Sequence, residues 1–363
     1  MPLDKIKKIV LLHVPTSICN LRCSYCYLAQ RNECYQGRQA ELKYTPEQVA
    51  KALSKERMGG ICYINFTAEG ETLLTKDIDT YCKALAEEGH FIEIVTNLTV
   101  TSMVDRILKW DKKLLEHIEF KCSFHYLELK RKKLLDVFAE NVNKIWMAGA
   151  SANIELPPSD ELIPYIPEIK RFSIKHFGAL PHLTITRDDR TKDIVKLTEL
   201  SEEEYINTWS QFDSDFWKYK MSIFGVRQNQ FCYAGKWSVY VNLANGEAKA
   251  CYFRPIGNIF ENPDKPIDSK PIGKCPIAHC YNGHMLLTLG VIPDATSICY
   301  GDIRNRVRRD GKEWIRMKMH HFLNTKLQDQ NTKWSWLHEQ AYVFSIKLTG
   351  KIKDKHHSHQ LSE

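Results

Sequence analysis

Short apolar runs alternate with longer stretches of mixed polarity through the first half of the chain. The segments between the runs carry apolar residues at the 3.6-residue spacing of amphipathic helices. Thr45-Pro46-Glu47 predicts the start of one such helix, because threonine caps a helix and proline suits its first turn. Six runs are rich in β-branched residues and predict strands: Ile9–Val14, Ile61–Thr67, Phe91–Thr96, Ile118–Ser123, Ala152–Leu156 and Leu183–Thr186.

Six strand–helix units in succession predict an α/β fold with a parallel sheet, because parallel strands need helical crossovers between them. We expect this sheet to curl into a partial (β/α)6 barrel. Chemistry in such barrels gathers at the carboxyl ends of the strands. Functional residues are therefore expected in the loops that follow the strands.

The pattern changes in the second half of the chain. Residues 200–225 predict a helix that leads out of the barrel, since Ser201 and three following glutamates supply a cap and an acidic first turn. From Phe231 onward, short strands, Gly and Pro turns and five cysteines fill residues 232–299. Three parts are expected: a barrel core (1–225), a small cysteine-rich domain (226–300) and a basic, aromatic-containing extension (301–363).

Composition is that of a soluble globular protein, with 43% hydrophobic and 26% charged residues among 363. Neither a membrane span nor the apolar core of a signal peptide is present, which predicts a cytoplasmic protein. The chain has 12 cysteines, which without an export signal predict metal ligation rather than disulfides. Four of them stand outside any close cluster and are expected to be buried as small hydrophobic residues: Cys34, Cys62, Cys82 and Cys122.

The net charge of +7 is concentrated in residues 301–363, where 13 Lys and Arg face 7 Asp and Glu. A nucleic-acid partner is one interpretation of such a segment. We favour a solvated extension instead, because basic and apolar residues interleave without a known binding motif. Its aromatic residues are then expected to pack on the body: Trp314, Trp334, Trp336, Tyr342 and Phe344.

Cys19, Cys23 and Cys26 form a C-x3-C-x2-C motif just after the first predicted strand. Thiolates at this spacing can supply three corner ligands of an iron–sulfur cube from one loop. The fourth iron is then open to a small molecule, and an open metal position is what catalysis requires. A zinc knuckle is the alternative.

The motif, with aromatic Tyr25 before the third cysteine, resembles the signature of radical S-adenosylmethionine (SAM) enzymes. The resemblance implies a [4Fe–4S] cluster whose open iron is chelated by SAM, and an electron donor such as flavodoxin or ferredoxin. It also implies the partial barrel. Residues 66–74 are similar to the family's Gly-Gly-Glu-Pro segment, although Glu69 and Thr72 replace a glycine and the proline.

Within this resemblance, Gly70 would let the backbone approach the ligand and Glu71 would accept from the SAM ammonium. Asn97 resembles part of a Thr-Asn-Gly turn with Leu98 in place of the glycine, and Ser123 matches a position that contacts SAM. Structural capping is the alternative for both. Two further polar residues at strand ends, with either a substrate or a core role, are His125 and Glu155.

Cys232 and Cys251 bracket a C-x13-G-x4-C hairpin that resembles the opening of SPASM and twitch modules. Asn245-Gly246 suits its tight turn. With Cys275 and Cys280 these residues suffice for one auxiliary [4Fe–4S] cluster, and structural zinc is the alternative. Three roles are open for Cys299. It is the fourth ligand of the auxiliary cluster in place of another cysteine, the donor of a hydrogen atom to a substrate radical, or a packing residue.

The resemblance implies hydrogen-atom abstraction that leads to dehydrogenation or epimerisation. Only 18 residues precede Cys19, which favours a carbohydrate-like or other small or conjugated substrate over a peptide bound by a fused N-terminal domain. Peptide modification, with cross-links or epimers, is the close alternative. Two alternatives from other functional classes are an iron–sulfur electron carrier and a zinc-binding interaction protein. Neither a membrane nor a nucleic acid is expected as a partner.

Overall fold

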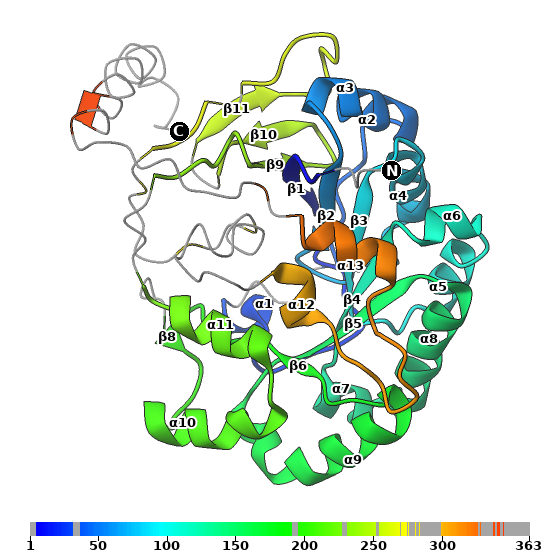
Figure 1. The fold of residues 1–363 in the computed structure, drawn as a ribbon, viewed down its shortest axis with the longest axis vertical. Helices are drawn as coiled ribbons and strands as arrows, with labels where there is room; N and C mark the ends of the chain where they lie inside the picture. Colours follow the sequence, from blue (N-terminus) through cyan, green and yellow to red (C-terminus); the bar gives the residue numbers. More distant parts are fainter. Residues whose placement is uncertain are drawn as a thin grey trace.

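The computed structural model describes residues 5–31, 37–190, 195–226, 231–251, 254–268, 270–273, 275, 280, 283, 299–325, 327, 337, 340–341 and 344. One nine-stranded sheet dominates it, in the order β11-β10-β9-β1-β2-β3-β4-β5-β6 (Figure 1). Its strands are β1 (Lys8–Val14), β2 (Cys62–Ala68), β3 (Phe91–Thr96), β4 (Ile118–Ser123), β5 (Ser151–Leu156), β6 (His182–Leu183), β9 (Ser238–Asn242), β10 (Glu247–Lys249) and β11 (Pro255–Asn258). β7 (Arg187–Asp188) and β8 (Val195–Lys196) form a separate antiparallel pair.

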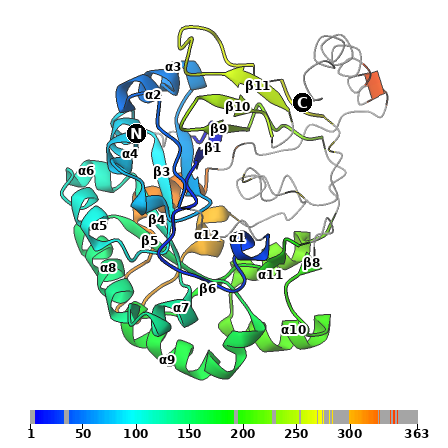
Figure 2. The same ribbon diagram turned by 180° about the vertical axis from the view of Figure 1, so that it is seen from behind.

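Helices cover the outer face of this sheet (Figures 1 and 2). The helices are α1 (Tyr27–Gln30), α2 (Pro46–Ala52), α3 (Lys55–Met58), α4 (Ile78–Glu87), α5 (Thr101–Ile107), α6 (Lys112–Leu115), α7 (Tyr126–Arg131), α8 (Leu135–Ala148), α9 (Ile166–Phe177), α10 (Glu202–Trp209), α11 (Asp215–Ile223), α12 (Tyr300–Arg304) and α13 (Met317–Leu323). Short 3-10 turns lie at Thr72–Leu74, Asp160–Tyr165 and Ser210–Phe212.

Strands β1 to β6 pair in parallel, each with the next along the chain, so the predicted α/β partial barrel is confirmed. The helix predicted at Thr45-Pro46 is also confirmed. Thr45 caps α2 by accepting from the backbone N–H of Gln48, whose side chain accepts in return from the N–H of Thr45.

Alternate residues of β1 serve two different cores. Val10, Leu12 and Val14 face the layer between the sheet and its helices. Ile9 and Leu11 face the barrel interior, where they meet residues from the later part of the chain. Successive side chains of a strand point to opposite faces of the sheet, so every second side chain of β1 lines the barrel interior.

The cysteine hairpin continues the barrel sheet. β9 pairs in parallel with β1, and β10 returns antiparallel to β9 through the turn at Asn245-Gly246. Gly246 has φ +76°, and a Cβ there would meet the Asn258 side-chain oxygen at 2.4 Å, so the turn requires glycine. The hairpin is confirmed, while the proposed domain limits at residues 225 and 300 stay predictions.

Residues 200–225 hold two helices rather than the single one expected. Ser201 caps α10 as predicted, but the chain then tightens into a 3-10 turn and Asp213 takes φ +45°. Ser214 caps a new helix, α11, by accepting from the N–H of Trp217. The break turns α11 toward the barrel, where it contacts β6 and α12.

α12 and α13 close the amino-terminal end of the barrel (Figure 1), opposite the face on which α1 lies (Figure 2). Phe322 of α13 stacks on Phe91 at the start of β3, with ring centroids 3.8 Å apart. Thr325 accepts a hydrogen bond from the backbone N–H of Ile6. The late segment therefore completes the barrel interior.

The aromatic residues of the segment 301–363 do not all pack on the body of the protein. Trp314 is fully buried and stacks with Trp146, which confirms the expectation of packing on the body. Phe344 is 65% exposed, so the same expectation is wrong there. Trp334, Trp336 and Tyr342 lie outside the described residues.

Of the four isolated cysteines, Cys62, Cys82 and Cys122 are fully buried as predicted, and Cys34 lies outside the described residues. Within the described part of the chain, none of the helices has the length and apolar character that crossing a bilayer would demand.

Candidate functional site

The loop between β1 and α1 carries Cys19, Cys23 and Cys26 at the carboxyl end of β1. Burial raises the pKa of Cys19 and of Cys23, and an electrostatic interaction with Cys26 raises both further. Such mutual effects require thiols that lie near one another. The donor set therefore fits a group of positive charge and soft character, such as an iron–sulfur cluster.

Among the described residues, no three Cys, His, Asp or Glu side chains are arranged to hold a single metal ion. The assignment of Cys19, Cys23 and Cys26 as cluster ligands thus stays a prediction from their spacing and chemistry. What the structure adds is how neighbouring elements hold the loop.

Gly70, at the turn after β2, lies directly against the cysteine loop. Its N–H donates to the carbonyl of Thr16, and the N–H of Glu71 donates to the carbonyl of Ile18. A Cβ on Gly70 would come within 2.1 Å of the Ile18 carbonyl oxygen, far inside contact distance. Only glycine allows this approach to the cysteine loop, whereas the approach of the Gly70 backbone to SAM stays a prediction.

We expect Gly70→Ala to displace the Ile18 backbone and with it the adjacent Cys19. The predicted result is a fall from about eight toward about four irons per chain after anaerobic reconstitution, because only the cluster at this loop is affected, with a loss of about 1–3 kcal/mol in unfolding free energy from the overpacked contact. Full iron retention by Gly70→Ala would show that the loop adjusts freely.

Glu71 is 2% exposed and its carboxylate already accepts three hydrogen bonds. The donors are the N–H of Leu73 (3.0 Å), the Thr96 hydroxyl (2.5 Å) and the N–H of Asn97 (2.6 Å). Burial raises the pKa of Glu71, and these bonds oppose the rise. Glu71 thus ties the turn after β2 to the turn after β3, and its contact with the SAM ammonium stays a prediction.

Asn97 joins the same turn to the cysteine loop. Its Nδ2 donates to Asn20 Oδ1 at 2.8 Å and lies 4.0 Å from Cys19 Sγ. Thr99 completes the contact, because its hydroxyl donates to Asn97 Oδ1 and accepts from Asn20 Nδ2. Asn97 is therefore placed to hold Cys19, whatever it does for a ligand.

Leu98 has φ +56°, a left-handed conformation that leucine rarely adopts. This explains why the resembling turn of the family has glycine where this chain has leucine. The Leu98 side chain is fully buried in the outer core, which compensates for the strained backbone.

The other side of the loop is held by α7 and the end of β4. The Tyr25 hydroxyl lies 2.7 Å from His125 Nδ1, and the N–H of Arg22 donates to Glu128 at 2.8 Å. Burial lowers the pKa of His125 to about 4, so this imidazole is neutral. Tyr25 and His125, both singled out in the sequence, are thus brought together.

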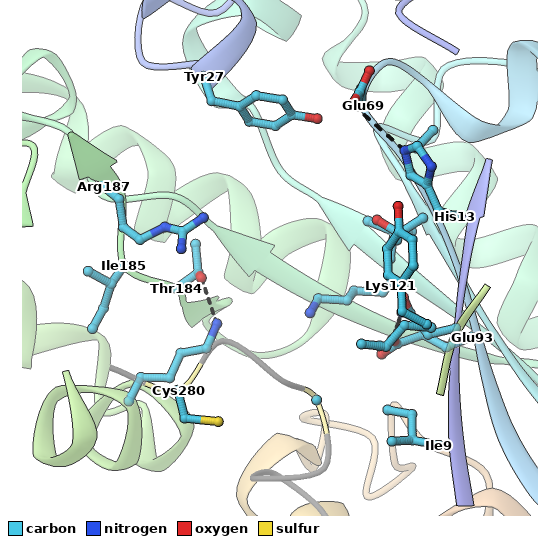
Figure 3. A pocket seen from close by; sticks show the side chains of 18 of the residues that line it. Ile9, His13, Tyr27, Glu69, Glu93, Lys121, Thr184, Ile185, Arg187 and Cys280 are labelled. Atoms are coloured by element: carbon cyan, nitrogen blue, oxygen red, sulfur yellow. Dashed lines mark hydrogen bonds and ion pairs between the residues drawn. The ribbon is translucent and has the colours of Figure 1, made fainter. Parts of the chain in front are cut away.

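A cavity of about 750 Å³ occupies the barrel interior, within the size range of small-molecule sites (Figure 3). It extends from Tyr27, directly after Cys26, to Tyr300 of α12. Its polar lining comes from several elements: His13, Tyr27, Arg31, Tyr63, Asn65, Thr67, Glu69, Glu93, Lys121, Thr184, Arg187, Asp189, Lys220, Tyr240, Cys280 and Tyr300. The cysteine loop therefore lies beside a partly open chamber whose lining is both polar and apolar.

Residues 13–121 match the family model of the radical SAM superfamily. The matched stretch contains all three cysteines of the motif. The resemblance read from Cys19, Cys23 and Cys26 is thereby confirmed at the level of the superfamily. No relative was found among curated proteins.

Solved structures similar to this chain include SuiB from Streptococcus suis, at 17% identity and a TM-score of 0.48 over 71% of this chain and 64% of SuiB. Native anSMEcpe with bound AdoMet is similar at 14% identity and a TM-score of 0.47, over 71% and 79% of the two chains. BtrN in complex with AdoMet and 2-DOIA is similar at 18% identity and 0.37, over 71% and 80%. The chain spans less than two thirds of SuiB, and such low similarities transfer neither substrate nor reaction.

The four cysteines assigned to an auxiliary cluster fall in the part of the chain after β8. A hydrogen bond with Cys275 and burial both raise the pKa of Cys232, and the charge of Cys280 adds to the rise. Cys232 and Cys251 pack in one small apolar cluster with Ala234, Ala250 and Ile272. The structure therefore brings Cys232 close to the other three, whereas their joint ligation stays a prediction.

Cys280 lines the cavity, and Cys299 does not appear among the described lining residues. Cys299 instead precedes α12 as its N-terminal cap residue. Its role as ligand, hydrogen donor or packing residue stays a prediction. Ser123 lies at the end of β4 as expected, paired in register with Glu155, and its contact with SAM also stays a prediction.

Sequence reasoning singled out Glu155 but missed the other charged residues inside the barrel. Glu119, Lys121 and Ser123 alternate along β4, so one face of that strand is polar, which was a usable signal. Arg187, Lys220 and Arg304 had no comparable signal, because they come from separate segments that only the fold brings together.

Proposed function

We propose that this chain is a radical SAM enzyme that acts on a small substrate in the barrel cavity. The observation that carries the proposal is the position of the three-cysteine loop, which is held by Gly70, Glu71 and Asn97 and runs directly into a residue lining the cavity, Tyr27. When bound, the cluster would deliver one electron that cleaves SAM and so generates a 5′-deoxyadenosyl radical able to take a hydrogen atom from a substrate carbon.

The residues of the chain supply orientation and exclusion of water. Cys19, Cys23 and Cys26 would hold the cluster, and Gly70, Glu71 and Asn97 keep their loop against the carboxyl ends of β1 to β3. Ser123 would contact SAM. α12 closes the amino-terminal end of the chamber and shields its contents from solvent from that side.

Cys232, Cys251, Cys275 and Cys280 would hold an auxiliary cluster. An auxiliary cluster beside the cavity would accept an electron from the substrate, which favours dehydrogenation. A free thiol would return a hydrogen atom and favour epimerisation. We propose Cys299 as the thiol to test for this, because the other four cysteines of residues 232–299 are assigned to the auxiliary cluster. The electron for the first cluster would come from a flavodoxin or a ferredoxin.

The test is anaerobic reconstitution with iron and sulfide, followed by reduction with dithionite in the presence of SAM. We expect about eight irons per chain, as two four-iron cubes require, and formation of 5′-deoxyadenosine. A result of four irons per chain, with formation of 5′-deoxyadenosine, would contradict only the auxiliary cluster in the proposal. Zinc in place of iron, or iron without SAM cleavage, would contradict the proposal.

A further inference from the structure

Lys220 brings a primary amine into the wall of the chamber. It belongs to α11, is half-buried and lines the chamber together with Thr184. The Thr184 hydroxyl lies 2.6 Å from Lys220 Nζ, the contact that is dashed at Thr184 in Figure 3. The amine also lies over the ring of Phe216, 4.3 Å from the ring centroid. A hydroxyl and an aromatic face therefore replace part of its hydration, and neither carries a full negative charge.

The carboxylates that line the chamber lie against basic side chains other than Lys220. These pairs are Glu93 with Arg304 at 3.0 Å, Asp189 with Arg31 at 3.2 Å, and Glu69 with His13 at 3.9 Å. Among the described residues, no carboxylate lies within ion-pair distance of Lys220. An ammonium that loses water without gaining a carboxylate partner is destabilised relative to the neutral amine.

The pKa of Lys220 agrees with this geometry. Burial lowers it to about 7, and Glu155 opposes the fall. Three cations on neighbouring elements lower it further: Lys121, Arg304 and Arg187. Near neutral pH a large share of Lys220 is therefore a neutral amine with a lone pair, whereas only roughly one in 2,500 ordinary lysine side chains is neutral at pH 7.

The elements that α11 contacts, β6 and α12, add no other charge beside the amine. Burial lowers the pKa of His182 on β6 well below its usual range and raises the pKa of Tyr300 on α12 well above its own, so both are uncharged. Asp302 of α12 pairs instead with His320 at 2.8 Å. The neutral state of Lys220 therefore follows from its place in the chamber wall.

We propose that Lys220 is the proton acceptor of the chamber and that the substrate presents a hydroxyl group to its amine. The inference rests on the proposed function, because it takes the chamber to be the substrate site. A neutral amine is suited to this role, since a general base works best when its pKa lies near the working pH. The neighbouring Thr184 hydroxyl orients the amine by hydrogen bonding.

The step that follows is the dehydrogenation of an alcohol. The C–H bond of the carbinol carbon breaks, and its hydrogen atom goes to the 5′-deoxyadenosyl radical. The O–H proton then goes to the lone pair of Lys220 Nζ. The unpaired electron leaves the substrate for the auxiliary iron–sulfur cluster, so that a C=O double bond remains. The proposal thus favours dehydrogenation over epimerisation and an alcohol as the substrate class.

The test measures the proton affinity of Lys220 in the reconstituted holoenzyme. Trace labelling with isotopic acetic anhydride under anaerobic conditions, across a range of pH, reports the neutral fraction of each lysine by mass spectrometry. We expect half-maximal labelling of Lys220 near pH 7. Lys218 is the matched reference on the same helix, because its hydrogen bonds with Asp213 and Asp215 raise its pKa, and it should label only at far higher pH.

A second arm tests the hydroxyl partner, with glycerol and myo-inositol as neutral probes and acetate as an anionic one. In the holoenzyme saturated with SAM, we expect at least one of the two polyols to protect Lys220 from labelling at neutral pH. Acetate should protect it less, because a neutral amine offers an anion no charge. Labelling of Lys218 should be the same with every probe.

The proposal is overturned if Lys220 labels only above about pH 9, as an ordinary lysine does, or at no pH. It is also overturned if neither polyol protects Lys220, if acetate protects it better, or if SAM alone abolishes its labelling. Failure of the proposed function would appear elsewhere, as wild-type holoenzyme that makes no 5′-deoxyadenosine while the labelling of Lys220 keeps its midpoint near neutral pH.

Discussion

Simultaneous replacement of Cys19, Cys23 and Cys26 by alanine is expected to remove about four irons per chain and to abolish 5′-deoxyadenosine formation from SAM. The reason is that these three thiols are proposed to hold the cluster whose open iron binds SAM. Iron and sulfide content after anaerobic reconstitution, with chromatographic detection of 5′-deoxyadenosine, measures both effects.

Cys82→Ala is the matched control, because Cys82 is fully buried, belongs to α4 and lies outside both cysteine groups. It should keep all of the iron and the full rate of SAM cleavage. If the triple variant still produced 5′-deoxyadenosine, the site of SAM cleavage would have to lie elsewhere in the chain.

Arg304→Met is expected to lower the free energy of unfolding by about 3–5 kcal/mol, the usual cost of removing one partner from a buried ionic group. Arg304 has no solvent exposure, and its guanidinium lies 3.0 Å from Glu93 and 2.9 Å from Glu119. Tyr63 also donates its hydroxyl to Glu119 at 2.8 Å. Without the arginine, two carboxylates would face one another in the closed end of the barrel.

The size of this loss should depend on pH. Burial raises the pKa of Glu119 to about 7, and Arg304 acts against that rise. Arg304→Met removes the opposing effect, so the folded-state pKa moves further above the unfolded value near 4.5. A carboxyl with a raised pKa stabilises the fold when protonated, at low pH, and this contribution is lost as pH rises.

Denaturant unfolding should therefore show that Arg304→Met loses more unfolding free energy, relative to the wild type, at pH 8 than at pH 5.5. Adding Glu119→Gln to the variant should recover part of the stability, because it removes one uncompensated charge. Arg309→Met is a suitable control, as Arg309 is exposed on the same segment. An unchanged unfolding free energy in Arg304→Met would mean that the carboxylates are already neutral.

The strands were predictable because buried parallel strands are continuous apolar runs, and all six predicted starts differ by one residue at most from those observed. β3 and β4 match at both ends, at Phe91–Thr96 and Ile118–Ser123. Predictions at helix caps were also reliable, as at Thr45 and Ser201, since a capping side chain acts on its own neighbours.

The inside of the barrel was not predictable in the same way. Arg304 stands in a basic segment, where sequence alone favours a solvated position, and its partners Glu93 and Glu119 lie on strands some two hundred residues earlier. The break at Asp213, which divides the predicted helix, depends on a left-handed backbone that no local rule requires of aspartate. These features follow from tertiary contacts between distant segments.

The closing of the barrel by α12 has a consequence for biosynthesis. Arg304 follows Glu119 by 185 residues, so the ribosome needs on the order of 10–40 s to produce the partner of a carboxylate already made. During that interval the amino-terminal end of the nascent barrel is open, and its buried acidic groups lack the charge of Arg304. We therefore expect the first two hundred residues to remain bound to the ribosome or a chaperone in an unfinished state, and insertion of any cluster to follow release of the complete chain.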